Sequence, residues 1–327
     1  MAEERTERSA RAAALKAGRS QKAPTRIIPM RLLTLAALVM LAVLALLAGL
    51  LYMVTRGDSA SIGGGAIGTL KAADYHSLVF GPNDPNVLFF GHHDGIMRSD
   101  DGGRTWSTLV EKRNFDAMNI AINRSNPRQV YLAGHDIFQM SLDGGANWQP
   151  VPNNLPGADL HGFAMSPSDP SRLYAFAVDH GVFLSTDGGQ NWQPLGGGQL
   201  PSDIMALATA GANPETLYAG SMMSGLLRST DGGKAWAAST NGLGSQGVRA
   251  LAVDPTSRKT VYAGTKDGLF KSTDGGTSWS RLTFPGNNVV AIAVSPVRPN
   301  IVEVIGVRDR DGLVYRSEDG GATWVSR

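Results

Sequence analysis

Histidine and aspartate side chains gather in one stretch of this 327-residue chain, and they are the residues best suited to chemistry. All the histidines lie between positions 76 and 180, each with an aspartate nearby. The set comprises His76, His92, His93, His135, His161 and His180, with Asp74, Asp94, Asp116, Asp136, Asp159 and Asp179. Imidazole and carboxylate groups together suit a divalent transition metal such as Zn, Mn or Fe. We expect these residues to bind a ligand, with His76, His93, His135 and His161 as the candidate metal ligands.

Two other interpretations of the same residues remain open. Such side chains also carry out acid–base catalysis, and a glycosidase needs only two carboxylates, about 5 Å apart for retention or about 6.5–9.5 Å for inversion. Asp74, Asp116 and Asp159 are the candidate catalytic residues, and Asp203 is a further carboxylate of this kind. Alternatively, the histidines are ordinary polar loop residues; the adjacent His92 and His93, in particular, cannot both point inward.

An eight-residue motif that occurs six times organises the chain around these residues. Its copies begin 42–45 residues apart and contain all six tryptophans. They are Ser99–Trp106, Ser141–Trp148, Ser185–Trp192, Ser229–Trp236, Ser272–Trp279 and Ser317–Trp324. Short apolar runs before and after each copy predict four strands per repeat. The sequence therefore predicts an all-β, six-bladed β-propeller of four-stranded blades over residues 66–327, closed by Ala66–Lys71 lying beside Thr323–Arg327.

The motif has a structural explanation that needs no function. Its Ser and Asp side chains bond the turn, its glycines allow positive φ, and its Trp packs against the neighbouring blade. The motif aspartates are expected to be spaced around the ring and are left out of any active site: Asp100, Asp143, Asp187, Asp231, Asp274 and Asp319. Loops entering the first strands share a face with loops between the second and third strands. All six histidines should therefore line one face, on repeats one to three.

The repeats resemble those of the Asp-box (BNR) proteins, which include sialidases, xyloglucan-cleaving glycosidases, sortilin and the photosystem II assembly factor. The resemblance implies the fold but not the function, because the family includes enzymes, receptors and assembly chaperones. The chain is most similar to bacterial Asp-box proteins described as glycosyl hydrolase-like. The matching positions are His76, His92 or His93, Asp116, His135, and Asp159 with His161. A true sialidase is not expected, because the arginine triad and the Tyr/Glu pair of that family are missing.

The N-terminal segment predicts a membrane anchor. Residues 32–55 carry no charge and are rich in Leu, Ala and Val. This segment is long enough for a membrane-spanning helix. Residues 1–31 form a basic tail that the positive-inside rule places in the cytoplasm, so the propeller should be periplasmic or extracellular. Residues 56–65 are predicted to form a linker. A cleaved signal peptide is the alternative, although its apolar core would normally be about 7–15 residues.

Charge and composition narrow the choice of function. Residues 57–327 hold 21 basic and 25 acidic side chains, so nucleic-acid binding is not expected. The chain has no cysteine and must be stabilised through its core. We expect a membrane-anchored binding module with a His/Asp-rich mouth. This mouth is expected to bind a metal, a small ligand, a glycan or a protein partner. The alternatives are a glycosyl hydrolase-like enzyme and an assembly factor for a membrane protein complex. In the photosystem II assembly factor the partner-binding face is expected to be basic, whereas the domain of this chain is acidic.

Overall fold

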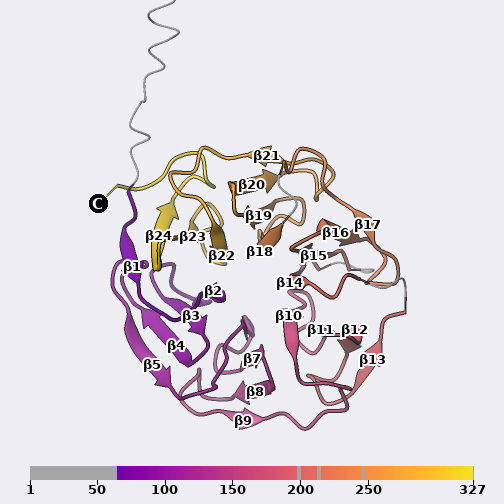
Figure 1. Ribbon diagram of the computed structural model, residues 1–327. Coiled ribbons are helices and arrows are strands. Elements are labelled where there is room, and N and C mark those ends of the chain that lie inside the picture. Colours follow the sequence, from indigo (N-terminus) through magenta and orange to yellow (C-terminus); the bar gives the residue numbers. More distant parts are fainter. Residues whose placement is uncertain (1–64, 197–199, 212–214, 245–246, 327) are drawn as a thin grey trace, which may run out of the picture. The chain divides into compact units, whose positions relative to one another are not determined.

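The computed structural model describes residues 65–196, 200–211, 215–244 and 247–326. These residues form six four-stranded antiparallel sheets arranged as blades around a central axis (Figure 1). The predicted all-β, six-bladed propeller with four-stranded blades is thus confirmed. The expected membrane helix, residues 32–55, lies outside the described residues. Among the residues that are described, no helix is long and apolar enough to cross a membrane.

Each blade runs from an inner strand beside the axis to an outer strand. Blades one to three consist of β2 (Ser77–Phe80), β3 (Leu88–His92), β4 (Gly95–Ser99) and β5 (Ser107–Glu111); β6 (Asn119–Ile122), β7 (Val130–Gly134), β8 (Ile137–Ser141) and β9 (Gln149–Pro150); and β10 (Leu160–Met165), β11 (Leu173–Ala177), β12 (Gly181–Ser185) and β13 (Trp192–Pro194). Blades four to six consist of β14 (Ile204–Thr209), β15 (Leu217–Ser221), β16 (Gly225–Ser229) and β17 (Ala237–Ala238); β18 (Val248–Val253), β19 (Val261–Thr265), β20 (Gly268–Ser272) and β21 (Ser280–Arg281); and β22 (Val289–Val294), β23 (Val302–Arg308), β24 (Asp311–Ser317) and β1 (Gly68–Leu70). The second strands β7, β11, β15 and β19 are buried at every position, because neighbouring blades cover both of their faces.

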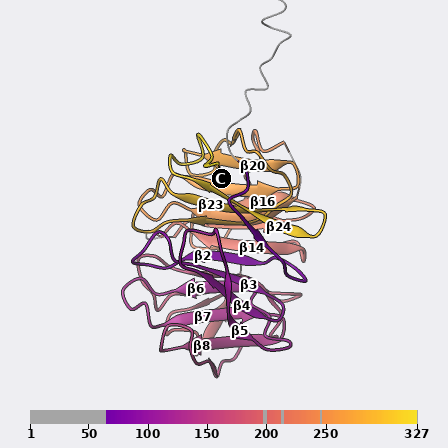
Figure 2. The same ribbon diagram turned by 90° about the vertical axis from the view of Figure 1, so that its left-hand side faces the viewer.

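The ring closes within blade six, where β1 supplies the outermost strand. Gly68 pairs with Val314 of β24, and Figure 2 shows the indigo N-terminal end of the propeller beside that strand. The sequence correctly predicted that Ala66–Lys71 closes the ring, but its expected partner, Thr323–Arg327, was wrong. Val325 N–H instead donates to the Arg316 carbonyl of β24 at 2.8 Å, and Ile67 N–H donates to the Val314 carbonyl at 2.8 Å. Ile67 and Val325, near the two ends of the described propeller, therefore follow one another along the same edge of β24.

The repeated motif is a self-contained turn, as blade three illustrates. The Ser185 hydroxyl donates to Asp187 Oδ1 at 2.8 Å and accepts the Gly189 N–H at 2.9 Å. Trp192 Nε1–H donates to the Gly189 carbonyl at 2.8 Å, and Gly189 has a φ of 91°, which favours glycine. Hydrogen bonds from the backbone and side chain of Asn191, with that from Ser185, lower the pKa of Asp187 to about 2. The motif carboxylates are therefore used by the turn itself.

One motif position differs from the prediction. In blade one the turn aspartate is Asp101, whose Oδ1 accepts the Ser99 hydroxyl at 2.9 Å, and not Asp100. Asp100 lies outside the turn network and pairs with Arg98 at 2.6 Å. The other five copies have their aspartate at the third position, directly before Gly-Gly, so aligning the copies also points to Asp101.

Neighbouring blades are joined through these turns. In three blades a tyrosine hydroxyl from the second strand donates to a glycine carbonyl in the next motif, at 3.0–3.1 Å: Tyr131 to Gly188, Tyr218 to Gly275 and Tyr262 to Gly320. At the seam between blades six and one, Arg316 of β24 makes the contact instead, and a buried ion pair with Glu303 of β23 in its own blade holds it in place. Arg316 Nη1 donates to Glu303 Oε1 at 2.9 Å and to the Pro85 carbonyl of blade one at 3.1 Å. Glu303 and Arg316 are 0% and 4% exposed, so this seam depends on both partners being present.

We predict that Arg316→Met lowers the free energy of unfolding by about 3–5 kcal/mol, because it leaves a buried carboxylate without its partner. Urea denaturation of the full-length chain measures the change. Glu318→Gln is the matched control, since Glu318 also contacts Arg316, at 3.3 Å, but its side chain is 64% exposed. Equal losses in the two variants would contradict the role of the buried pair.

The lowered pKa of Asp187 predicts how stability changes in acid. The ionised carboxylate stabilises the fold above its ordinary pKa of about 4, and that contribution is lost as the pH falls toward about 2. The free energy of unfolding should therefore fall less steeply over this range in Asp187→Asn than in the wild-type chain. Urea denaturation at several pH values measures both slopes, and identical slopes would count against the turn as the cause.

Candidate functional site

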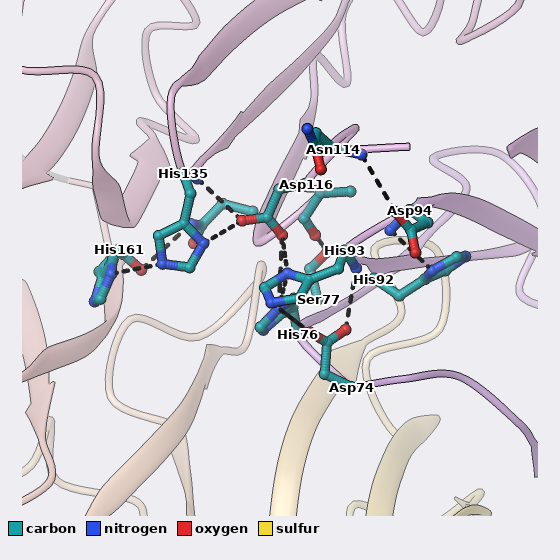
Figure 3. A network of polar contacts seen from close by, with 12 residues as sticks. Asp74, His76, Ser77, His92, His93, Asp94, Asn114, Asp116, His135 and His161 are labelled. Carbon is teal, nitrogen blue, oxygen red and sulfur yellow. Dashed lines mark hydrogen bonds and ion pairs between the residues drawn. The ribbon is translucent and has the colours of Figure 1, made fainter. Parts of the chain in front are cut away.

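Seven of the predicted site residues meet on the face opposite the motif turns, across blades one to three. They come from the segments that enter β2, β6 and β10 and from the turns that follow β3 and β7. Figure 3 shows most of this network. The seven residues, here called the mouth cluster, are Asp74, His76, His93, Asp116, His135, Asp159 and His161. The four candidate metal ligands predicted from the sequence are thus brought together by the fold.

Asp116 lies at the centre of the mouth cluster and is 4% exposed. Its Oδ1 lies 2.7 Å from His93 Nδ1, and its Oδ2 accepts from His135 Nδ1 and, at 3.0 Å, from the His135 backbone N–H. A carboxylate that accepts from Nδ1 holds the proton on that nitrogen and leaves Nε2 unprotonated. Figure 3 shows Asp116 between the two rings. Each ring therefore turns its Nε2 away from Asp116.

His135 turns its Nε2 toward a second histidine and a carboxylate from blade three. His135 Nε2 lies 3.0 Å from His161 Nε2 and 3.8 Å from Asp159 Oδ1, and His161 Nε2 lies 3.2 Å from Asp159 Oδ1. A point equidistant from three atoms so spaced is about 2.0 Å from each, which matches Zn–N and Zn–O bond lengths. We call these three residues the His135 set.

His93 turns its Nε2 toward a similar pair from blade one. Asp74 Oδ2 lies 2.8 Å from His93 Nε2 and 3.1 Å from His76 Nε2. The two imidazole rings are 4.8 Å apart between centroids. We call Asp74, His76 and His93 the His93 set.

Most of the aspartates at the mouth also have a structural function. Asp74, Asp116 and Asp203 each accept the backbone N–H of a strand-connecting turn in their own blade, at 3.0, 3.0 and 2.6 Å. Asp159 differs, because its buried Oδ1 accepts no hydrogen bond from any described residue. The fold therefore leaves this oxygen available to a ligand.

Burial and hydrogen bonding shift the pKa values in the mouth cluster in different directions. Burial alone would raise the pKa of Asp116, but hydrogen bonds from His93 and the His135 backbone lower it. Burial lowers the pKa of His161 despite the charge of Asp159. Burial likewise opposes the charge on His93, but the hydrogen bond to Asp116 and the negative charges of Asp116 and Asp74 together outweigh it and raise the pKa of His93.

Five other predicted residues do not join the mouth cluster. His92 stacks on Phe90, with ring centroids 5.9 Å apart, so only His93 of the adjacent pair points inward. Asp94 accepts a turn N–H from Asn114 at 3.2 Å. The others occupy exposed turns: Asp136 and Asp179, with φ of 54° and 63°, and the adjacent His180.

A cavity of about 360 Å³ opens beside the His93 set and extends across the mouth of the channel. Asp74 and His76 line one side of it, and Met118, Met205 and Arg249 are also in its wall. The two methionines were not singled out from the sequence. A spacing signal was present, since Asp-x-His at 74–76 and 159–161 alternates with Asp-x-Met at 116–118 and 203–205.

The geometry suits metal binding better than a pair of catalytic carboxylates. Mixed imidazole and carboxylate donors converge at both ends of the cluster, as a Zn or Fe site requires. Asp116, a candidate catalytic residue, has both oxygens engaged by histidines. A free carboxylate of the kind a glycosidase uses as nucleophile or general acid is therefore not present at that position.

Comparison with known families finds two matches in the sequence. The model described as photosynthesis system II assembly factor YCF48 matches residues 197–327, which is blades four to six. The model of the BNR/Asp-box repeat matches residues 97–108 and 183–194. A comparison with curated protein sequences finds no match.

Solved structures share the fold at low sequence identity. A GH74 xyloglucanase from Xanthomonas campestris has 20% identity and a TM-score of 0.55, with 80% of this chain and 45% of that chain covered. The GH74 enzyme of Niastella koreensis has 16% identity and a TM-score of 0.52, with coverage of 77% and 46%. YCF48 from Cyanidioschyzon merolae has 15% identity and a TM-score of 0.50, with coverage of 80% and 87%. The chain thus spans less than half the length of the GH74 enzymes it matches, and the likeness is one of fold.

Proposed function

We propose that this chain, an Asp-box (BNR) repeat β-propeller, is a membrane-anchored binding module whose mouth holds a divalent transition metal on the His135 set. The observation that carries the proposal is the convergence of His135 Nε2, His161 Nε2 and Asp159 Oδ1, with separations of 3.0–3.8 Å. Three protein ligands leave a coordination position for water or a ligand, as in catalytic and ligand-binding metal sites.

A metal accounts for the close approach of two imidazole Nε2 atoms and for a carboxylate oxygen that hydrogen bonding leaves unsatisfied. His135 and His161 face each other through Nε2, and Asp159 Oδ1 is buried without a hydrogen-bond donor from the described residues. A divalent cation satisfies all three atoms at once. Asp116 fits the same interpretation, since metal-bound histidines usually donate their other ring N–H to a carboxylate. Zn and Fe suit two imidazoles and one carboxylate, and Mn is the third candidate.

We propose that residues 32–55 anchor the module, with residues 1–31 in the cytoplasm and the propeller, 66–327, on the other side of the membrane. The support is a run of 24 uncharged residues and the excess of Lys and Arg before it. The module would then meet its ligand in the periplasm or outside the cell.

A second candidate is the docking of a partner protein, as in an assembly factor. The match to the assembly-factor model over residues 197–327 favours it, and these blades carry no residue of the mouth cluster. A chain that binds no metal but is required for one membrane protein complex to accumulate would favour this second function. A glycosyl hydrolase-like activity has weaker support, because likeness to the GH74 enzymes extends to the fold alone.

We predict that the purified full-length chain, loaded with Zn(II) or Fe(II) and desalted, retains metal by elemental mass spectrometry. His135→Ala with His161→Ala should lose one equivalent, because two of the three ligands are gone. His180→Ala is the matched control and should retain the wild-type content, since His180 lies outside the mouth cluster. A wild-type chain that retains no metal would sink the proposal.

The chain has no cysteine, so a single cysteine introduced at a chosen position can report on which side of the membrane that position lies. We predict that a membrane-impermeant maleimide labels intact cells carrying Ser107→Cys, on the propeller, but not Ser20→Cys, in the tail. Both variants should label after the cells are lysed. The reverse pattern, or recovery of the chain in the soluble fraction, would overturn the proposed topology.

A further inference from the structure

The His93 set repeats the chemistry of the His135 set on the other side of Asp116. Each set has one Asp-x-His segment entering an inner strand, Asp74–His76 or Asp159–His161, and one histidine from a strand-connecting turn. In both sets the turn histidine gives its Nδ1 to Asp116 and directs its Nε2 to the carboxylate of the set. Blade one supplies one set alone, whereas blades two and three supply the other.

Negative charge is spread along the whole mouth cluster and not gathered at one of its ends. Asp74, Asp116 and Asp159 bring three carboxylates together, and within the described part of the chain their ion-pair partners are all histidines, with no Lys or Arg among them. A dication on the His135 set lies beside Asp159, whereas Asp74 pairs with His76 and His93. A cation at each end stabilises clustered carboxylates better than a cation at one end alone.

We infer that the mouth holds two metal ions, the second on Asp74, His76 and His93, and that Asp116 couples the two sites as their common outer-shell acceptor. The inference rests on the proposed function for the first ion. The rings of His93 and His135 lie 5.6 Å apart between centroids, on opposite sides of Asp116. Each ion has its own three ligands, and what the ions share is the carboxylate that orients one ligand of each.

Sharing one carboxylate sets the sign of the coupling. A metal on the His135 set polarises the His135 Nδ1–H and draws the negative charge of Asp116 toward it. His93 then has a weaker acceptor, and two like-charged ions held by adjoining sites repel each other. The second ion therefore binds more weakly than the first, by at least about fivefold, the lower end of common coupling between sites.

The test is a titration of the chelator-stripped full-length chain with Zn(II), followed by calorimetry and by metal analysis after desalting. The wild-type chain should bind two equivalents, the second more weakly. His76→Ala and His161→Ala should each bind one, and the double variant should bind none. His92→Ala and His180→Ala are matched controls and should bind two.

Asp116→Ala distinguishes coupled sites from independent ones. It removes both shared acceptor oxygens but no ligand, so both affinities should fall by about 10–100-fold, as is usual when an outer-shell partner is lost. Circular dichroism and thermal unfolding identify any variant that fails to fold, and His76→Gln replaces His76→Ala in that case.

The outcomes separate this inference from the proposed function. A wild-type chain that binds no zinc would overturn both. One wild-type equivalent that is lost in His161→Ala and retained in His76→Ala would leave the proposed function standing and overturn the second site. Two equivalents with an Asp116→Ala variant that weakens only one of them would overturn the coupling.

Discussion

Pairing of β1 with β24 is the constraint on which the propeller depends. Each blade is a sheet whose two faces must be buried against neighbours, so an open array would expose the faces at both ends. The short N-terminal strand completes blade six and brings blade six against blade one, where Arg316 reaches Glu303 and the Pro85 carbonyl. Backbone hydrogen bonds therefore complete blade six, and the arginine of its buried ion pair reaches across the seam to blade one.

The position of the mouth cluster follows from this closure. Asp74 and His76 lie in the segment between β1, which belongs to blade six, and β2, which begins blade one. Their partner His93 follows the next strand of blade one, while Asp159 and His161 belong to blade three. Ring geometry brings these distant segments together around Asp116, the buried carboxylate of blade two. The chemistry at the mouth thus depends on strand pairing at the opposite edge of the blades.

Much of the fold could be predicted from the sequence, because one turn is repeated six times with its tryptophan. The repeat defined the blade number and the shared face, and so correctly grouped His76, His93, His135 and His161. The motif aspartate of the first copy was predicted wrongly as Asp100, although its position before Gly-Gly in the other five copies corresponds to Asp101. The choice between His92 and His93 depended on strand pleat, which places one ring on Phe90 and the other in the mouth.

The turn-bonded aspartates have a consequence for how such a ring evolves. Asp203 holds its turn through the Met223 N–H, as Asp116 does through the His135 N–H, although blade four has methionine where blade two has histidine. The aspartate thus fixes the backbone of the turn, whereas the turn residue itself supplies the side-chain atom that can bind a ligand. A blade can exchange imidazole for thioether, or lose both, without weakening the turn that presents them. Gene duplication of such blades supplies ready-made positions at which new ligand chemistry can be selected while the architecture is inherited unchanged.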